Sequence, residues 1–220
     1  MNLSRVLHID DYRLFTEHLA VDQVRHMLTD YRYEHEHRKW EYGLALKAVL
    51  DSGARTVLDV GGAGSVLSPL LAYYGLDVTQ LDPGAGKESV DSQNKSLGIN
   101  IEFIDGRFST VDIGMFDAVV SISTIEHVED DITFFHELLN HANLMVFMTM
   151  DFYPTRKVFS KDHERTYNKE DLYRFCDIAE KSNFIVEYSP YIYRGSFVYD
   201  YTFASLLVRK KYSMTYSGGY

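Results

Sequence analysis

The stretch Val57-Leu58-Asp59-Val60-Gly61-Gly62-Ala63-Gly64-Ser65 decides the fold. It begins with the apolar pattern of a buried strand, continues into a glycine-rich turn and is followed by a helical pattern over Val66–Tyr74. Glycine permits the positive φ and the close backbone approach that a ligand-binding turn requires. Open α/β sheets bind ligands at the carboxyl ends of their strands. The stretch therefore predicts a ligand site at the end of the first strand of a parallel sheet.

Short β-branched runs alternate with helical patterns along most of the chain, which is typical of a mostly parallel sheet with helices on both faces. The predicted strands are Thr56–Val60, Asp77–Leu81, Ile101–Ile104, Ala118–Ile122, Leu144–Thr149, Phe184–Tyr188 and Thr202–Val208. No helical pattern separates the last two, so we expect them to form an antiparallel pair. The expected fold is an α/β, Rossmann-like, doubly wound, seven-stranded mixed sheet with one antiparallel edge pair.

Helical periodicity also predicts the elements around the sheet. Beyond Val66–Tyr74, helices are expected at Lys87–Leu97, around Phe135, and from about Lys169 with Asn168 as N-cap. The stripes Val21-Val24-Leu28 and Trp40-Leu44-Ala48 indicate a helical lead-in. At 220 residues the chain suits one core. We expect a helical extension over 1–52, a ligand-binding domain over 53–212 and a flexible tail over 213–220.

Charge and apolar patterning exclude several classes of protein. The formal charge is −10 and the basic residues are scattered, which disfavours duplex nucleic acid as a partner. Apolar stretches such as Leu144–Met150 are too short to span a membrane, and Met1–Asp11 lacks the apolar region of a signal peptide. A lone cysteine, Cys176, cannot form an internal disulfide. We expect a cytoplasmic protein without a membrane partner, and the sequence indicates no oligomeric state.

Acidic residues follow the next two strands. Asp82 stands 21 residues after Gly61, where a carboxylate can accept hydrogen bonds from both hydroxyls of a ribose. A plain turn at Asp82-Pro83-Gly84 is the alternative. After the third strand, Asp105 is the candidate for holding an adenine amino group. The fourth strand leads into the polar loop of Phe116–Val128 beside the same crevice. These features together predict a nucleoside-bearing cofactor.

These motifs resemble the class I S-adenosylmethionine (SAM)-dependent methyltransferases, in particular the type-11-like branch that methylates small molecules and sugars, from about Arg38 to Val208. The resemblance implies SAM as cofactor and S-adenosyl-L-homocysteine (SAH) as product. It places the methionine part at the first strand, ribose at the second, adenine after the third and the substrate beside the loop after the fourth. The residues it assigns to the cofactor are Asp59, Gly61, Gly62, Ala63, Gly64, Asp82, Pro83, Asp105, Gly106, Arg107, Phe108, Ser121, Ile122 and Ser123.

Ala63 and Ser65 depart from the glycine pattern of the family, and the role of Arg38 has two interpretations. The family has Gly-x-Gly-x-Gly, whereas alignment on Gly61 puts Ala63 and Ser65 at the second and third glycines. Both residues are small, and Gly62 and Gly64 can supply the flexibility, but a loss of cofactor affinity stays an alternative. Arg38 is the candidate for a lid over the cofactor carboxylate, with an exposed helical arginine as the alternative.

Glu126 and His127 are the candidate catalytic residues. A histidine accepts a proton near neutral pH, so His127 is placed to act as the base that a hydroxyl acceptor requires. The alternative is that Glu126 and His127 brace the following segment. Adjacent Glu-His also occurs in metal-dependent RNA end methyltransferases, but Ser123 stands where that pattern has another carboxylate. We therefore predict no metal site.

The expected function is methylation of oxygen or nitrogen on a small molecule or a glycan. No Asp-Pro-Pro-Tyr or Asn-Pro-Pro-Tyr follows the fourth strand, which argues against methylation of the amino groups of DNA bases. Two alternatives stay open. An RNA methyltransferase would have a basic surface around the crevice, and a non-catalytic binding or structural module would have a weak or blocked cofactor site.

Overall fold

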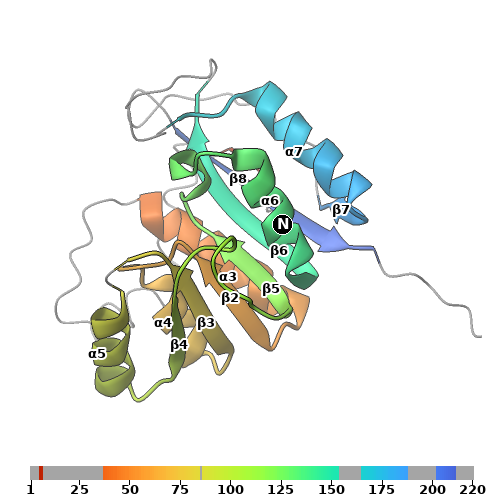
Figure 1. Ribbon diagram of the computed structural model, residues 1–220. Coiled ribbons are helices and arrows are strands. Elements are labelled where there is room, and N and C mark those ends of the chain that lie inside the picture. Colours follow the sequence, from red (N-terminus) through yellow and green to blue (C-terminus); the bar gives the residue numbers. More distant parts are fainter. Residues whose placement is uncertain (1–4, 7–36, 85, 154–164, 188–201, 212–220) are drawn as a thin grey trace, which may run out of the picture.

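A mixed β-sheet of eight strands forms the centre of the described part of the chain. The computed structural model describes residues 5–6, 37–84, 86–153, 165–187 and 202–211 (Figure 1). The strand order is β1-β8-β6-β5-β2-β3-β4, and β7 also pairs with β8. The strands are β1 (Arg5–Val6), β2 (Thr56–Val60), β3 (Asp77–Asp82), β4 (Ile101–Asp105), β5 (Phe116–Ser121), β6 (Ala142–Phe152), β7 (Phe184–Val186) and β8 (Thr202–Lys210).

The strand order reverses direction between β2 and β5. From β2 the chain moves outward through β3 to β4, and it then returns to form β5 and β6 on the other side of β2. These five strands are parallel, whereas β8 is antiparallel to β6, β7 and β1. Because Val60 pairs with Leu81 and Asp82 pairs with Asp105, strands β2, β3 and β4 end at one edge of the sheet. In open α/β sheets, ligands bind at this kind of edge, outside the point where the strand order reverses.

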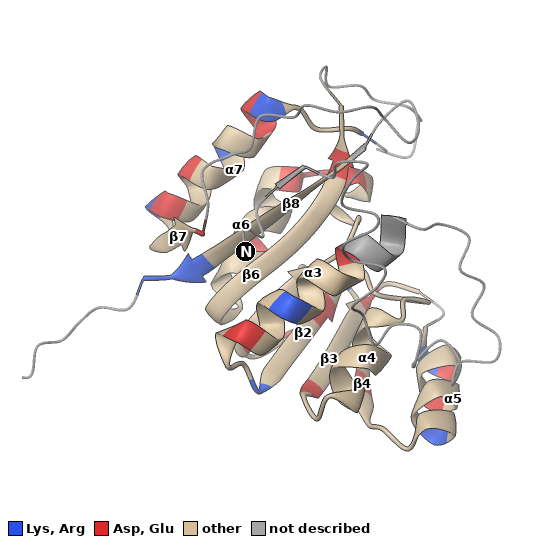
Figure 2. Cartoon of the chain, turned by 180° about the vertical axis from the view of Figure 1, so that it is seen from behind, with Lys and Arg blue, Asp and Glu red and all other residues tan. Residues whose placement is uncertain are grey.

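Helices cover both faces of this sheet (Figures 1 and 2). Helices α6 and α7 lie in front of the sheet in Figure 1, and α3 and α4 lie in front of it in the view from behind. One core, containing Leu44, Leu67 and Val90, lies under α3, α4 and α5, and a second, containing Phe135 and Phe175, lies under α6 and α7. The helices are α3 (His37–Ser52), α4 (Leu67–Tyr73), α5 (Lys87–Leu97), α6 (Asp131–Asn140) and α7 (Lys169–Lys181).

The central strands are buried on both faces, which explains their continuous apolar sequences. Val57 and Leu58 of β2 are fully buried, and Val57 belongs to one core whereas Leu58 belongs to the other. Val119 and Val120 of β5 divide between the two cores in the same way. Two cores thus hold β2 and β5 in place, so the turns after these strands start from a rigid base.

A loop, rather than a helix, connects β4 to β5. Residues 106–115 contain no helix, although the other parallel connections among the described residues do. Ile113 is buried in the core under α6, and the Phe108 ring stacks on His141 with centroids 5.1 Å apart. The ring nitrogen Nδ1 of His141 lies 3.0 Å from the Gly114 carbonyl oxygen. The loop is therefore held against α6 at its two ends.

The predicted fold class is confirmed. All seven predicted strands form, and the last two make the expected antiparallel pair. Asn168 caps α7, because its side chain accepts from the Asp171 amide at 3.0 Å and the Asp171 carboxylate accepts from the Asn168 amide at 3.1 Å. The predicted stripe over 21–28 and the predicted tail over 213–220 lie outside the described residues.

One strand departs from the expected helical lead-in. Arg5–Val6 forms β1, which extends the sheet beyond β8 by pairing with Ser205 and Ala204. Two residues carry too little pattern to show a strand in sequence, and their pairing partner lies about two hundred residues away along the chain. No described helix combines the length and the apolar character that crossing a bilayer requires.

Candidate functional site

The glycine-rich turn after β2 is packed tightly against the loop after β5. Gly61 has φ of +77°, and its amide donates to the Leu81 carbonyl oxygen at 2.8 Å. A Cβ atom at this position would overlap the side chain of Thr124. Gly64 also has a positive φ, +75°, but a Cβ atom at this position would meet no neighbouring atom within 4 Å. Gly61 is thus required for both its conformation and its lack of a side chain.

Asp82 faces this turn from the end of β3. Its carboxylate Oδ2 accepts a hydrogen bond from the Ala63 amide at 3.1 Å. The Gly84 amide donates to the Asp82 carbonyl oxygen at 3.1 Å, so Asp82-Pro83-Gly84 also forms a turn. The structure therefore contains both the turn at Asp82-Pro83-Gly84 and a carboxylate that faces the glycine-rich segment.

Asp59 is a buried carboxylate beneath the turn. The Ser68 hydroxyl donates to its Oδ2 at 2.7 Å. Burial raises the pKa of Asp59 from 3.8 to about 6, the hydrogen bond from Ser68 opposes that rise and the charge of Asp82 adds to it. A Cβ atom at Gly62 would overlap the Asp59 carboxylate. The Asp59 carboxylate thus occupies the space that a side chain at position 62 would need, and it lies directly beside the glycine-rich turn.

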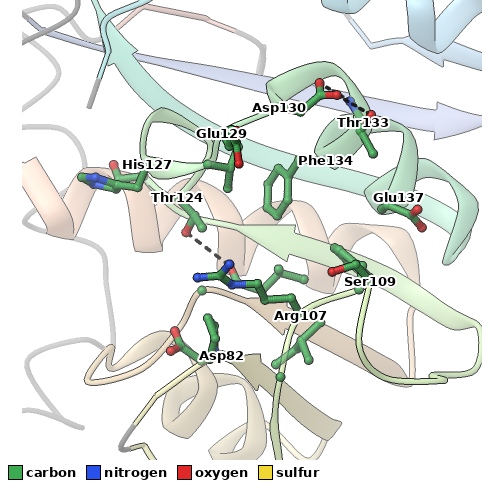
Figure 3. A pocket seen from close by; sticks show the side chains of 18 residues that line it. Asp82, Arg107, Ser109, Thr124, His127, Glu129, Asp130, Thr133, Phe134 and Glu137 are labelled. Carbon is green, nitrogen blue, oxygen red and sulfur yellow. Dashed lines mark hydrogen bonds between the residues drawn. The ribbon is translucent and has the colours of Figure 1, made fainter. Parts of the chain in front are cut away.

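Two cavities open at this edge of the sheet. The larger, of about 690 Å³, lies between the ends of β2, β3 and β4 and the start of α6 (Figure 3). The smaller, of about 140 Å³, is lined by Tyr42, Asp59, Ile122 and the turn residues Gly62–Ser65. Gly61 and Ser123 line both cavities. The predicted residues that line the larger cavity are Gly61, Asp82, Pro83, Gly106, Arg107, Phe108, Ser123 and His127.

Some predicted residues do not line either cavity. Asp105 is exposed and is not among the lining residues, although Gly106 directly after it is. Ser121 is buried, and its hydroxyl donates to the Val60 carbonyl oxygen at 3.2 Å, which ties β5 to β2. Arg38 lies in α3, but the placement of its side chain is outside the described part of the structure.

Glu126 and His127 occupy different environments. His127 is exposed and lines the larger cavity, and its backbone amide donates to the Thr124 carbonyl oxygen at 3.0 Å within the short helix η1 (Ile125–His127). Glu126 is buried and does not line the cavity. Its carbonyl oxygen accepts from the Arg165 amide at 3.1 Å. His127 is therefore the member of the pair that can reach a bound molecule.

A buried arginine supports the wall of the larger cavity. Nη2 of Arg165 donates to the carbonyl oxygens of Val128 at 2.6 Å and Glu129 at 3.0 Å, and Nη1 lies 3.4 Å from the Asp131 carboxylate. The Tyr167 hydroxyl donates to the Ile125 carbonyl oxygen at 2.9 Å. The segment before α7 thus fixes the backbone of the loop after β5.

Glu41 and Thr124 are site residues that the motifs do not reveal. Thr124 packs against Gly61, and its hydroxyl donates to the carbonyl oxygens of Ile122 at 3.1 Å and Val60 at 3.3 Å. Glu41 lies on the helical stripe shared with Leu44 and Ala48, which are buried. An acidic residue on an apolar stripe is a signal that could have found Glu41, whereas Thr124 lies within the predicted polar loop of Phe116–Val128 but has no signal of its own.

Comparisons with known proteins match this geometry. A family model described as "Methyltransferase domain", of type 11, matches residues 58–142, from β2 through α6. A ubiquinone biosynthesis O-methyltransferase from Azorhizobium caulinodans is 31% identical over 101 residues, which cover 43% of this chain and 40% of the relative. Residues 58–142 of this chain are thus similar to the methyltransferase domain of SAM-dependent enzymes. The chain spans less than half the length of the curated methyltransferases that it matches.

Solved methyltransferases share the fold over most of the chain. Magnesium protoporphyrin IX methyltransferase from Synechocystis PCC 6803, solved with SAH, has a TM-score of 0.60 at 16% identity and covers 90% of this chain and 98% of its own. The 1,6-didemethyltoxoflavin-N1-methyltransferase from Burkholderia thailandensis has a TM-score of 0.61 at 16% identity and covers 90% and 86%. At 16% identity, this similarity shows a shared fold alone.

The two departures from the methyltransferase glycine pattern cause no backbone strain. The positive φ angles fall on Gly61 and Gly64, so Ala63 and Ser65 keep ordinary conformations. The Ala63 amide bonds Asp82, and the Ser65 hydroxyl accepts from the Leu67 amide at 2.9 Å at the start of α4. A methyltransferase turn can therefore form here without its second and third glycines. Within the described ranges, no group of three acidic, histidine or cysteine side chains is placed to hold a metal ion.

Proposed function

We propose that this chain transfers the methyl group of SAM to oxygen or nitrogen of a small molecule or a glycan. The observation that carries the proposal is the hydrogen bond between Asp82, which lines the larger cavity, and Ala63, which lines the smaller one, beside Gly61, which lines both. This arrangement places a carboxylate and a tight glycine turn at the point where the strand order reverses. When bound, SAM supplies an activated methyl group for a one-step displacement.

The two cavities divide the cofactor between them. We assign the adenosine part to the larger cavity, where Asp82 accepts from the ribose hydroxyls and Gly106, Arg107 and Phe108 line the adenine end. Asp105, directly before Gly106, is our candidate for the adenine amino group. The methionine part is assigned to the smaller cavity, beside Asp59 and the residues Gly62–Ser65. The methyl group then faces Gly61 and Ser123, which line both cavities.

His127 is our candidate for the base. A hydroxyl acceptor must lose a proton, and His127 is exposed in the wall of the larger cavity, where its ring can accept one. Glu126 belongs to the same short helix, and its buried position supports that helix. Most of the acceleration comes from orientation of the two reactants, because effective molarities of about 10⁵ M or more are attainable in this way.

The charge of the cavity favours a neutral or cationic acceptor. Four carboxylates line it, those of Asp82, Glu129, Asp130 and Glu137, against one guanidinium, that of Arg107 (Figure 3). A phosphate backbone would be repelled by this lining, whereas an RNA methyltransferase would have a basic surface here. The names of the relatives, ubiquinone biosynthesis O-methyltransferases, support a small molecule and favour oxygen as the atom methylated.

Calorimetric titration with SAM and with SAH tests the proposal. We expect micromolar binding of both compounds by the purified protein, which would justify a screen of phenolic and other hydroxylated acceptors for SAH formation. Absence of binding by either compound would contradict the proposal and make a non-catalytic module the leading interpretation. Binding without turnover on any acceptor in a broad screen would also favour the module.

A further inference from the structure

We infer that Glu41 is a positioning residue, which holds Ser123 in the left-handed conformation that shapes the wall between the two cavities. This inference rests on the proposed function, since it assigns a role in the same cofactor site. Glu41 lies in α3, 82 residues before Ser123 and 108 residues before Thr149. Its side chain is fully buried and does not line either cavity, so it acts through its partners.

Three hydrogen bonds connect Glu41, Ser123 and Thr149. Its Oε1 accepts from the Ser123 hydroxyl and from the Thr149 hydroxyl, each at 2.6 Å. The Thr149 hydroxyl oxygen in turn accepts from the Ser123 amide at 3.1 Å. Ser123 is therefore held at its side chain by Glu41 and at its backbone by Thr149. All three residues are buried, and hydrogen bonds are stronger in such an environment than in water.

Ser123 needs this support because its backbone is strained. Its φ is +46°, in the left-handed region that residues with a Cβ atom rarely adopt. Ser123 and Asn183 are the two described residues other than glycine with positive φ. A strained conformation persists only where the surroundings fix it, and the bonds from Glu41 and Thr149 do so here.

The turn at Ser123 sets the direction of the chain toward the cavity wall. Thr124 comes next, and its side chain packs against Gly61 and bonds the Val60 carbonyl oxygen. The helix η1 then carries His127 into the wall of the larger cavity. A Ser123 that relaxed to negative φ would redirect Thr124 away from Gly61. Glu41 thus links α3 to the place where the cofactor's methyl group is proposed to lie.

The inference is tested with SAM and SAH titrations of four variants alongside the wild type. Glu41→Leu removes the hydrogen-bond acceptor, whereas Glu41→Gln keeps an acceptor oxygen. Ser123→Gly permits a positive φ without support from neighbours. The fourth variant combines Glu41→Leu with Ser123→Gly. Asp51→Leu is the control, because Asp51 is an exposed acidic residue on the same helix, paired only to Lys47 among the contacts seen for it.

We expect Glu41→Leu to weaken SAM binding about tenfold and Asp51→Leu to leave it unchanged. Glu41→Gln should stay closer to the wild type than Glu41→Leu. The combined variant should recover most of the affinity lost by Glu41→Leu, because glycine adopts the left-handed conformation unaided. A loss of packing alone would not be relieved by Ser123→Gly, so this recovery separates positioning from general structural support.

Three results would overturn the inference: wild-type SAM affinity in Glu41→Leu, equal loss in Glu41→Gln, or no recovery in the combined variant. If Glu41→Leu does not fold, as judged by circular dichroism and thermal melting, Ser123→Ala and Ser123→Gly are compared instead. Both lack the hydroxyl and only the first keeps a Cβ atom, so Ser123→Ala should bind SAM more weakly, and equal affinities would contradict the inference. A wild-type protein that binds neither compound would overturn the proposed function itself.

Discussion

The Asp82 carboxylate lies 3.1 Å from the Ala63 amide nitrogen, which joins the end of β3 to the glycine-rich turn after β2. This carboxylate lines the larger cavity and has a second oxygen available for a bound ribose. We expect Asp82→Ala to weaken SAM binding about 100-fold, since two hydrogen bonds to a charged group are lost. Calorimetry measures this change, and Asp77→Ala is the control because Asp77 is exposed at the start of the same strand. Unchanged affinity in Asp82→Ala would remove Asp82 as the ribose ligand.

Gly61 and Gly64 form a matched pair for a test of the turn. Both have positive φ, but only at Gly61 would a Cβ atom overlap a neighbour, the Thr124 side chain. Gly64→Ala should lower the free energy of unfolding by about 1 kcal/mol through backbone strain alone. Gly61→Ala should lower it further and abolish SAM binding. Urea unfolding and calorimetry measure both effects, and equal losses in the two variants would show that Thr124 does not crowd Gly61.

His127 is expected to act in turnover and not in cofactor binding. With an acceptor identified by screening, His127→Ala should keep the SAM affinity of the wild type and lower kcat by about 10² to 10⁴, the contribution of a positioned base. His136→Ala is the control, because His136 is an exposed histidine on α6 that lines neither cavity. Unchanged turnover in His127→Ala would remove His127 as the base and favour a bracing role.

Asp59 should make the protein less stable as the pH rises. Its pKa is about 6 in the folded protein and 3.8 ordinarily, so the folded state binds a proton that the unfolded state has released between these values. The stability from this proton is complete below pH 3.8 and is lost as the pH rises through 6, with a total of about 3 kcal/mol. Asp59→Asn carries no such titration. The difference in unfolding free energy between Asp59→Asn and the wild type should therefore grow between pH 4 and pH 7, and a constant difference would contradict the raised pKa.

The parts of the fold predicted from the sequence are those with a local pattern. β2 is predictable to the residue, because the run Thr56-Val57-Leu58-Asp59-Val60, which is rich in β-branched and apolar residues, ends at a glycine turn. The cap at Asn168 and the pairing of the last two strands are equally local signals. The positions of Asp82 and Gly61 follow from strand lengths, which explains why they face the same cavity.

The parts that the sequence does not reveal depend on contacts between distant residues. Glu41 meets Ser123 and Thr149 only because α3 packs across β5 and β6, and no spacing in the chain encodes that meeting. Asp105 is a different case. The end of its strand is predictable from the sequence, but its side chain is exposed and does not line the cavity, although Gly106 does. A strand boundary fixes where a residue lies and leaves the direction of its side chain to packing.

The loop of residues 106–115 forms part of the wall of the larger cavity, so we expect the stability of this loop to depend on the molecule that fills the cavity. This loop contains no helix, Ile113 is its only buried residue, and Gly106–Ser109 form part of the cavity wall. A ligand present at 100 times its Kd stabilises a folded protein by about 2.7 kcal/mol through mass action. Much of that gain would fall on this loop, so resistance to proteolytic cleavage there would report on the supply of cofactor in the protein's surroundings.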